Sequence, residues 1–202
     1  MPITLYRARF STNVERVTLA LEHKGLEYES AWIEYSDRSP VIEVSGQELV
    51  PVMVDGDLVI NDSLVILAYL EENWPDPPLF PRDRARRAET YVFLEWFDTV
   101  WKPAPNAIEA ALAAGAEPDP EHGVAIARRL DRFERMLESR DYLLGDEFTA
   151  ADCAAYPFLK FAAGRPEGDD ERFHLILDEH QSVEGHPRLA AWIERVAALP
   201  QA

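Results

Sequence analysis

Four prolines fall within the eight residues from Trp74 to Pro81, and this segment limits the possible folds more than any other part of the sequence. Proline has no backbone N–H and a fixed φ, so such a segment stops a helix and stiffens a linker. The patterns on its two sides also differ. We therefore predict one domain over residues 1–76, a linker over 77–83 and a second domain over 84–202.

The first seventy residues read as a small mixed sheet with helices. A β-like run at Ile3–Tyr6 is followed by helical spacing over Val14–Lys24, which Gly25 ends, and by a strand at Glu27–Ile33. This is a βαβ unit. A polar stretch that continues to Leu49 is predicted to be irregular.

A hairpin and a helix complete the first domain. Val50–Val54 and Leu58–Ile60 are predicted strands on either side of the turn-forming Asp55-Gly56-Asp57, and a helix is expected over Ser63–Asn73. The order βαβ, then ββα, fits a small mixed sheet rather than a doubly wound parallel sheet.

The second domain is predicted to be all-α. Helical periodicity covers four segments, Arg84–Trp101, Glu121–Arg140, Thr149–Ala163 and Pro187–Leu199. Phe173–Leu177 is ambiguous between strand and helix. Residues Ala110–Pro120 and Gly164–Asp170 are expected to be exposed loops.

Charge and cysteine content exclude several classes of function. The formal net charge of -17 repels phosphate backbones and anionic lipids, so we expect neither nucleic acid nor a membrane as a partner. The first residues lack the pattern of a secretory signal, which favours a cytoplasmic location. Cys153 is the only cysteine, so an internal disulfide, a CxxC pair and a multi-cysteine zinc site are all excluded.

Three segments carry a family resemblance. Ser11–Leu26, Leu49–Glu72 and Leu143–Cys153 together resemble the cytosolic glutathione transferases, and Leu49–Glu72 follows that family's "VP…DG…ES…I..YL" block almost without a gap. The resemblance covers the whole chain. It implies a thioredoxin-like N-terminal domain that binds glutathione, followed by a helical-bundle domain that binds the second substrate.

Val50-Pro51 is the most distinctive pair of the second segment. A cis bond is found in only ~5–6% of X-Pro bonds, yet a proline between strand-forming residues invites one. The resemblance implies that a cis Val50–Pro51 bond turns the backbone of Val50 towards the cysteinyl part of glutathione, as an added strand would do. The alternative is an ordinary proline at a strand edge.

Asp62 and Ser63 stand where a strand gives way to a helix, and both are natural capping residues. The resemblance implies that they also hold the γ-glutamyl end of glutathione. The Ser63 hydroxyl and a helix N-terminus suit its carboxylate, and the Asp62 carboxylate suits its ammonium group. Capping and binding are compatible.

Ser11 is the candidate catalytic residue. No nearby histidine suggests a hydrolase triad, but a serine at a helix N-terminus is able to donate a hydrogen bond to a bound thiolate. The alternative is a simple N-cap. Thr12 and Asn13 replace the residues that usually follow the serine in this family, so either is a candidate to share the contact with sulfur.

The remaining predicted contacts are less specific. The family's Asn-Pro before the Val-Pro strand is missing, which leaves Arg38 and Gln47 as candidates, by position only, for the glycyl carboxylate. Four aromatic residues are candidates for the substrate pocket, Phe10, Trp96, Phe97 and Trp101. Core packing or a dimer interface explains the last three equally well.

Other polar patterns have structural explanations. Thr149 and Asp152 form an S/T-x-x-D/E capping box, and Cys153 next to them is expected to be buried and unreactive. His174 and Asp178 are the only tempting metal pair, and without a third ligand we predict no metal site. The arginines of Arg128–Arg135 alternate with acids, which favours a solvated helix face with ion pairs.

The function predicted from these features is that of a glutathione S-transferase. The enzyme would activate the thiol of glutathione, as co-substrate and without a prosthetic group, for attack on a hydrophobic electrophile in conjugation, isomerisation or peroxide reduction. Detoxification and a homodimer follow from the resemblance. The alternatives are a maleylacetoacetate isomerase-like enzyme and a non-catalytic protein that keeps the fold for protein contacts.

Overall fold

The computed structural model describes residues 2–199, and it divides into two compact units. The first unit ends at Phe80 and the second covers Pro81–Ala198. The two units meet between Phe80 and Pro81, within the proline-rich segment and inside the predicted linker of residues 77–83. Residues 1 and 200–202, which the predicted domain ranges include, lie outside the described residues.

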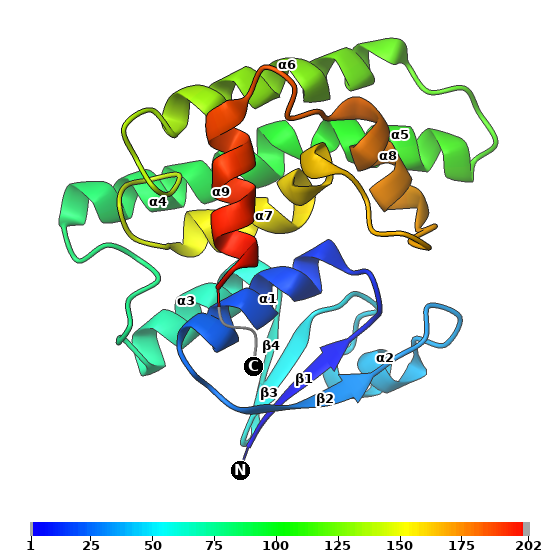
Figure 1. The fold of residues 1–202 in the computed structure, drawn as a ribbon. Helices are drawn as coiled ribbons and strands as arrows, with labels where there is room; N and C mark the ends of the chain where they lie inside the picture. The colour runs from blue at the N-terminus through cyan, green and yellow to red at the C-terminus, as the bar shows by residue number, and fades with distance from the viewer. Residues whose placement is uncertain (1, 200–202) are drawn as a thin grey trace. The chain divides into compact units, whose positions relative to one another are not determined.

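The first unit contains a four-stranded sheet in the order β2-β1-β3-β4 (Figure 1). Its strands are β1 (Ile3–Arg7), β2 (Tyr28–Trp32), β3 (Val52–Asp55) and β4 (Leu58–Asn61). β1 and β2 are parallel, whereas β1 with β3 and β3 with β4 are antiparallel. The mixed sheet predicted from the sequence is therefore confirmed.

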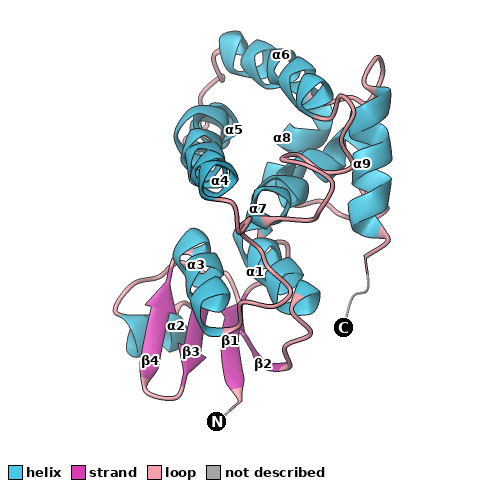
Figure 2. Cartoon of the chain, turned by 90° about the vertical axis from the view of Figure 1, so that its left-hand side faces the viewer, coloured by secondary structure: helices cyan, strands magenta, loops and turns pink. Residues whose placement is uncertain are grey.

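Helices cover the sheet of the first unit. The helices α1 (Thr12–His23) and α3 (Ser63–Asn73) lie side by side (Figure 2). The short helix α2 (Ser39–Ser45) contributes Val41, which packs with Val52 and its neighbours of the sheet in a separate small core. Because side chains alternate along a strand, Val52 and the buried Met53 face opposite sides, so both faces of the sheet are covered.

Helix α2 corrects the prediction of an irregular stretch up to Leu49. It has seven residues, begins with Pro40 in its first turn and ends at Gly46, whose φ of 73° is left-handed. Val41 is its only buried residue. A helix with one buried position has no apolar repeat, so periodicity cannot detect it.

A buried ion pair fixes the proline-rich segment to the first unit. Lys24 Nζ lies 3.2 Å from Glu71 Oε2 and also donates to the carbonyl oxygens of Trp74 and Pro77. The Leu79 N–H donates to the same Glu71 oxygen at 2.8 Å. Both charged side chains are thus compensated, as burial of charge requires.

The second unit is helical, as predicted. Its elements are α4 (Arg84–Trp96), η1 (Phe97–Trp101, a π-helical turn), α5 (Pro103–Ala113), α6 (Pro120–Met136), α7 (Ala150–Leu159), η2 (Lys160–Ala163, a 3₁₀ turn), α8 (Arg172–His180) and α9 (Pro187–Ala197). Two predictions need correction. The first residues of the expected loop Ala110–Pro120 belong to α5, and the ambiguous Phe173–Leu177 is part of α8.

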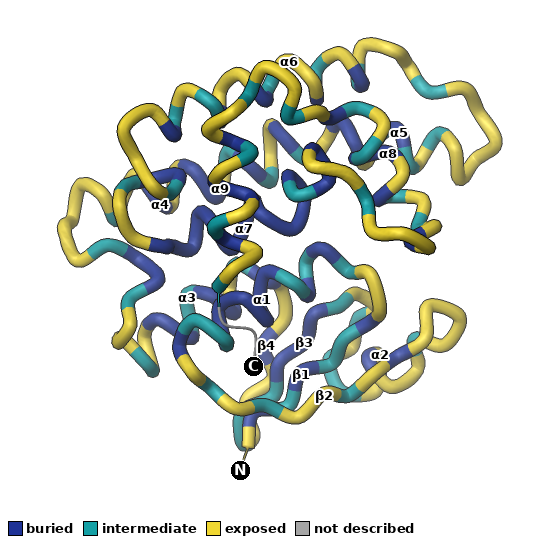
Figure 3. Tube along the Cα trace, in the orientation of Figure 1, coloured by how far each residue is buried: buried dark blue, intermediate teal, exposed yellow. Residues whose placement is uncertain are grey.

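Helix α7 is buried along its whole length, which Figure 3 shows as a dark blue stretch. The predicted capping box is present at its start, because the Thr149 side chain accepts from the backbone of the first turn and Asp152 Oδ2 accepts from Thr149 N–H at 2.9 Å. Thr149 Oγ also donates to Asp152 Oδ2 at 3.0 Å. Asp152 Oδ1 accepts from Leu143 N–H at 3.0 Å and from Trp192 Nε1 at 2.8 Å. Burial raises the pKa of the Asp152 carboxyl, and these four hydrogen bonds act in the opposite direction.

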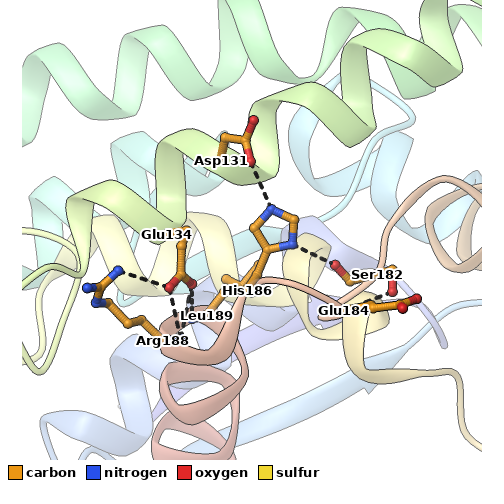
Figure 4. Close-up of polar contacts among 7 residues, drawn as sticks. All are labelled: Asp131, Glu134, Ser182, Glu184, His186, Arg188 and Leu189. Atoms are coloured by element: carbon orange, nitrogen blue, oxygen red, sulfur yellow. Dashed lines mark hydrogen bonds and ion pairs between the residues drawn. The ribbon is translucent and has the colours of Figure 1, made fainter.

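Two contacts of α6 with other helices are close. A Cβ atom added at Gly123 would lie 2.7 Å from the imidazole ring of His180 on α8, so this pair of helices needs glycine there. Near the other end, Asp131 and Glu134 bond the start of α9 (Figure 4).

Within the described residues, no helix combines the length and apolar character that crossing a membrane requires.

Candidate functional site

The register of the strands brings three predicted segments to the same end of the sheet. Tyr6 near the end of β1 pairs with Val52 at the start of β3, and Val52 pairs with Asn61 at the end of β4. The loop after β1, the residues before β3 and the residues after β4 therefore lie at the same end of the sheet. These segments carry Ser11, Val50-Pro51 and Asp62-Ser63.

Ser11 is the N-cap of α1, with an extended backbone at φ −79° and ψ 109°. Its hydroxyl oxygen accepts a hydrogen bond from Val14 N–H at 3.3 Å. A hydroxyl that accepts through its oxygen still has its own proton to donate. Capping therefore leaves Ser11 able to donate a hydrogen bond to a ligand, and the residue is partly exposed.

The two neighbours of Ser11 differ in accessibility. Thr12 is buried, with 7% of its surface exposed, whereas Asn13 is partly exposed. Phe10, on the other side, has φ at 61° and is 45% exposed. A positive φ is uncommon for a residue with a side chain and marks a sharp turn of the chain before α1. Ser11 and Asn13 are thus better placed than Thr12 to meet a ligand.

The Val50–Pro51 peptide bond is cis, as the family resemblance implied. Pairing of β3 begins two residues later, at Val52. Within the described residues, the backbone N–H and C=O of Val50 take no hydrogen-bond partner. Unpaired backbone groups next to a strand are suited to bind an extended ligand as an additional strand.

Asp62 and Ser63 both act at the start of α3. Asp62 Oδ1 accepts from Leu64 N–H at 2.8 Å and from Val65 N–H at 3.3 Å. The backbone of Asp62 is at φ 72° and ψ 126°, a conformation that costs energy for a residue other than glycine. The capping predicted for Asp62 is confirmed.

Ser63 has a partner that sequence reasoning missed. Its hydroxyl accepts from Arg16 Nη1 at 3.3 Å, and the Arg16 side chain is completely buried. Arg16 comes from α1 and thus links the helix that begins after Ser11 to the helix that begins at Ser63. The available signal was an arginine between Val14 and Val17, within the buried stripe of α1.

Gln47 makes local hydrogen bonds in the loop before the Val50-Pro51 pair. Its amide oxygen accepts from Leu49 N–H at 2.6 Å, and its amide nitrogen donates to the Leu49 carbonyl at 2.8 Å. The side chain thus completes the hydrogen bonds of the residue before Val50-Pro51, which is a positioning role. A contact of Gln47 with the glycyl carboxylate stays a prediction, and it would require the side chain to leave these partners.

Arg38 retains some capacity to bind a carboxylate. Its guanidinium lies over the Tyr35 ring, 4.7 Å from the centroid, and donates to the carbonyls of Tyr35 and Glu48 at 3.3 Å each. A guanidinium has five N–H donors, so these two bonds leave others available.

The aromatic residues predicted for a substrate pocket separate into two groups. Phe97 and Trp101 are fully buried, and their rings stack at 4.7 Å among other rings of the second unit. The core-packing alternative describes this pair in the structure, and their part in a substrate pocket stays a prediction. Trp96 is partly exposed, with Arg132 over its ring at 5.0 Å, and Phe10 is exposed.

The remaining polar candidates have structural partners. His174 Nδ1 lies 2.8 Å from Asp169 Oδ2, not from Asp178, which faces Arg165 at 3.8 Å. Among the residues that the structure describes, no group of three potential ligands is placed to hold a metal ion. The thiol of Cys153 is buried.

Two family descriptions match the sequence. "Glutathione S-transferase, N-terminal domain" covers residues 5–78, and "Glutathione S-transferase, C-terminal domain" covers residues 109–195. Glutathione S-transferase Z2 of Arabidopsis thaliana is 31% identical over 210 residues, covering 98% of this chain and 87% of the relative. The chain belongs to the glutathione S-transferase family.

Other relatives show how widely this glutathione S-transferase fold is used. A stringent starvation protein A homolog of Coxiella burnetii is 27% identical and covers 78% of this chain and 74% of its own length. The solved structure of the beta-etherase LigF from Sphingobium sp. strain SYK-6 has a TM-score of 0.82 at 23% identity, with 100% of this chain and 97% of that chain covered. The thioredoxin-like domain followed by a helical domain is thus confirmed for this member of the family.

Proposed function

We propose that this glutathione S-transferase activates the thiol of glutathione through Ser11 and directs the thiolate to a hydrophobic electrophile. Conjugation, isomerisation and peroxide reduction are all within the reach of such a thiolate. Membership of the family supports glutathione as the co-substrate without a prosthetic group.

The observation that carries this proposal is the hydrogen bonding of Ser11. The hydroxyl oxygen accepts from Val14 N–H, so the hydroxyl proton is directed elsewhere and is available to a thiolate. The N-terminus of α1 adds a positive potential at the same place. Both effects stabilise ionised sulfur. A free thiol has a pKa of ~8.5, so a decrease of about two units would convert most of it to thiolate at neutral pH.

The other end of glutathione is proposed to lie at the start of α3. The Ser63 hydroxyl, which accepts from Arg16, keeps its own proton for the γ-glutamyl carboxylate. The Asp62 carboxylate caps with one oxygen, Oδ1, and its other oxygen suits the ammonium group. Between the two ends, the unpaired backbone of Val50 suits the cysteinyl part.

The decisive measurement is the ultraviolet absorbance of the glutathione thiolate, titrated across pH with the wild-type protein and with Ser11→Ala. We expect the bound thiol to titrate about two pH units below the free thiol with wild-type protein, and close to it with Ser11→Ala. Thr12→Ala is the matched control, because Thr12 is buried, and Asn13→Ala tests the other accessible neighbour.

Two results would overturn the proposal. Glutathione that binds with an unshifted thiol pKa would remove the role in activation. A shift that survives Ser11→Ala and disappears with Asn13→Ala would transfer that role to Asn13.

A non-catalytic function is the second candidate. It is favoured by the likeness to a stringent starvation protein A homolog, whose name describes no transferase. A protein of this kind has no need to keep a thiol site, so retention on immobilised glutathione separates the two. Retention that free glutathione reverses favours the enzyme, and a protein that passes through unretained favours the alternative.

We also propose a cytoplasmic homodimer, as membership of the family suggests. Light scattering coupled to size-exclusion chromatography at several protein concentrations tests the dimer. The expected mass is twice the 22.9 kDa of the chain, and a monomer at every concentration would refute it.

A further inference from the structure

Two acidic side chains of α6, Asp131 and Glu134, contact the start of α9. Glu134 accepts from the backbone N–H groups of Arg188 and Leu189 at 3.0 Å each, and from the Arg188 side chain at 3.2 Å. Asp131 Oδ1 lies 3.1 Å from His186 Nε2 (Figure 4). A carboxylate that receives the first N–H groups of a helix is a cap, so Glu134 has a structural role.

The arginines of the same helix are not paired with these acids. Arg128, Arg132 and Arg135 follow one another at i, i+4 and i+7, which places them on one stripe of α6, away from the buried stripe that includes Ile126 and Leu130. The ion pairs predicted along this face do not form within the described residues. Arg132 lies over the Trp96 ring, and among residues 2–199 neither Arg128 nor Arg135 has an acidic partner.

A hollow of about 410 Å³ opens at the end of this stripe, lined by Arg132, Arg135, Met136, Glu138 and Arg140. Arg140 has one fixed contact, from its Nη1 to the Leu143 carbonyl at 3.4 Å. The volume of the hollow lies within the range of small-molecule sites. Three guanidinium groups therefore border a space of ligand size.

The local charge is opposite to that of the whole molecule. Residues 128–140 contain five arginines and three acidic residues, whereas the chain has a net charge of -17. Guanidinium groups form bidentate hydrogen bonds with carboxylates and phosphates, for which their planar fork is suited. A long polyanion would extend beyond the hollow and be repelled by the acidic surface around it. A small anion would contact the arginines without approaching that acidic surface.

We propose that this hollow binds a small molecule that carries at least two phosphate or carboxylate groups. Arg135 would be the principal contact, because no residue of the described chain pairs with its guanidinium, with Arg132 and Arg140 on either side. Glu138 is the opposing charge of the site, and its only described ion pair is a 4.0 Å contact with Arg188. This site does not depend on the binding of glutathione.

The test is calorimetric titration of the full chain with pyrophosphate and, separately, with citrate. We expect saturable binding with one site per chain, weakened about tenfold by Arg135→Gln through the loss of charge-assisted hydrogen bonds. Arg128→Gln is the matched control. It removes the same charge from the same helix, but outside the hollow, and should change the affinity less than about twofold. Glu138→Gln should strengthen binding.

Each alternative result has a meaning. Comparison of the two probes shows whether the site prefers phosphate or carboxylate. The proposal is overturned if neither probe binds to the wild-type protein, or if Arg128→Gln weakens binding as much as Arg135→Gln, because the effect would then be diffuse attraction. Arg135 is exposed, so thermal unfolding should confirm that the variant keeps its stability.

Discussion

Arg16 brings a buried positive charge to the residues that are proposed to bind glutathione. The guanidinium is completely buried and bonds Ser63 Oγ, which stands at the N-terminus of α3. The positive end of the helix and the arginine therefore act at the same place, and both favour an anionic ligand. The sequence could not predict this contact, because long basic residues on a helix usually extend their charged ends into water.

Arg16→Met should weaken the binding of glutathione more than it slows the chemical step. We expect KM for glutathione to rise about tenfold, with kcat lowered less than about threefold, because the lost interaction supports ground-state binding. Steady-state kinetics with a common electrophile would measure both constants. Arg16→Lys should recover part of the affinity, whereas the exposed Arg9→Met should change nothing. Equal losses of kcat and affinity would contradict this role.

His23 should make the stability of the first unit depend on pH. Its Nε2 lies 3.3 Å from the Pro78 carbonyl, which only accepts, so the nitrogen carries a proton. Burial lowers the pKa of His23 in the folded state. Below the usual histidine pKa of ~6.5, the unfolded chain then binds more protons than the folded one, so acidification costs stability that is fully present above that pH.

His23→Gln provides the comparison, because glutamine keeps a donor but does not titrate. Urea unfolding at pH 7.5 and at pH 5.5 should show a smaller loss of stability for the variant than for the wild-type protein. The groups that titrate elsewhere are common to both proteins and cancel in this difference. Equal losses would show that His23 contributes nothing to the pH dependence.

Helix α7 depends strongly on a single side chain, that of Asp152. Asp152 accepts from Leu143, Thr149 and Trp192, which lie before the helix, at its cap and on α9. Asp152→Ala should reduce the free energy of unfolding by at least ~3 kcal/mol, because it leaves several buried donors without an acceptor. Asp146→Ala, in an exposed loop nearby, should stay within ~0.5 kcal/mol of wild type in the same urea titration. A similar effect of the two substitutions would refute this role of Asp152.

Elements with a repeating pattern were predictable, and those shaped by tertiary contacts were not. The helix expected at Ser63–Asn73 has those bounds in the structure, because Asp62 caps it and the proline-rich segment ends it. Helix α2 offers one buried position and escaped detection. Phe173–Leu177 lacks enough length to decide between periods by itself, and packing within the second unit makes it helical.

The candidate site was predictable where a motif imposes backbone geometry. Val50-Pro51 and the cap at Asp62 belong to this kind, since an X-Pro bond and a helix start restrict the chain locally. Gln47 and Trp101 were assigned by position or by residue type. Their side chains turn instead to a neighbouring backbone and to the helical core, and a sequence contains no direct information on that choice.

At the scale of the whole molecule, the net charge of -17 should make stability increase with salt. The acidic groups on the surface repel one another. Salt shortens the distance over which this repulsion acts, from ~30 Å at 0.01 M to ~8 Å at 0.15 M. We expect Tm to rise by about 2–4 °C between these concentrations, which corresponds to ~1 kcal/mol for a chain of this size. Differential scanning calorimetry in NaCl and in KCl would measure it. A decrease in both salts would show that ion pairs such as Arg188 with Glu134 outweigh the repulsion.

Gly123 sets a limit on how this protein can be engineered. Replacing a helical glycine by alanine is a common route to greater stability, because it reduces the freedom of the unfolded chain. Here the added methyl group would meet the His180 ring, so the usual gain turns into a loss unless His180 is reduced in size as well. The two positions therefore need to be varied together, because a library that varies Gly123 alone would discard the alanine.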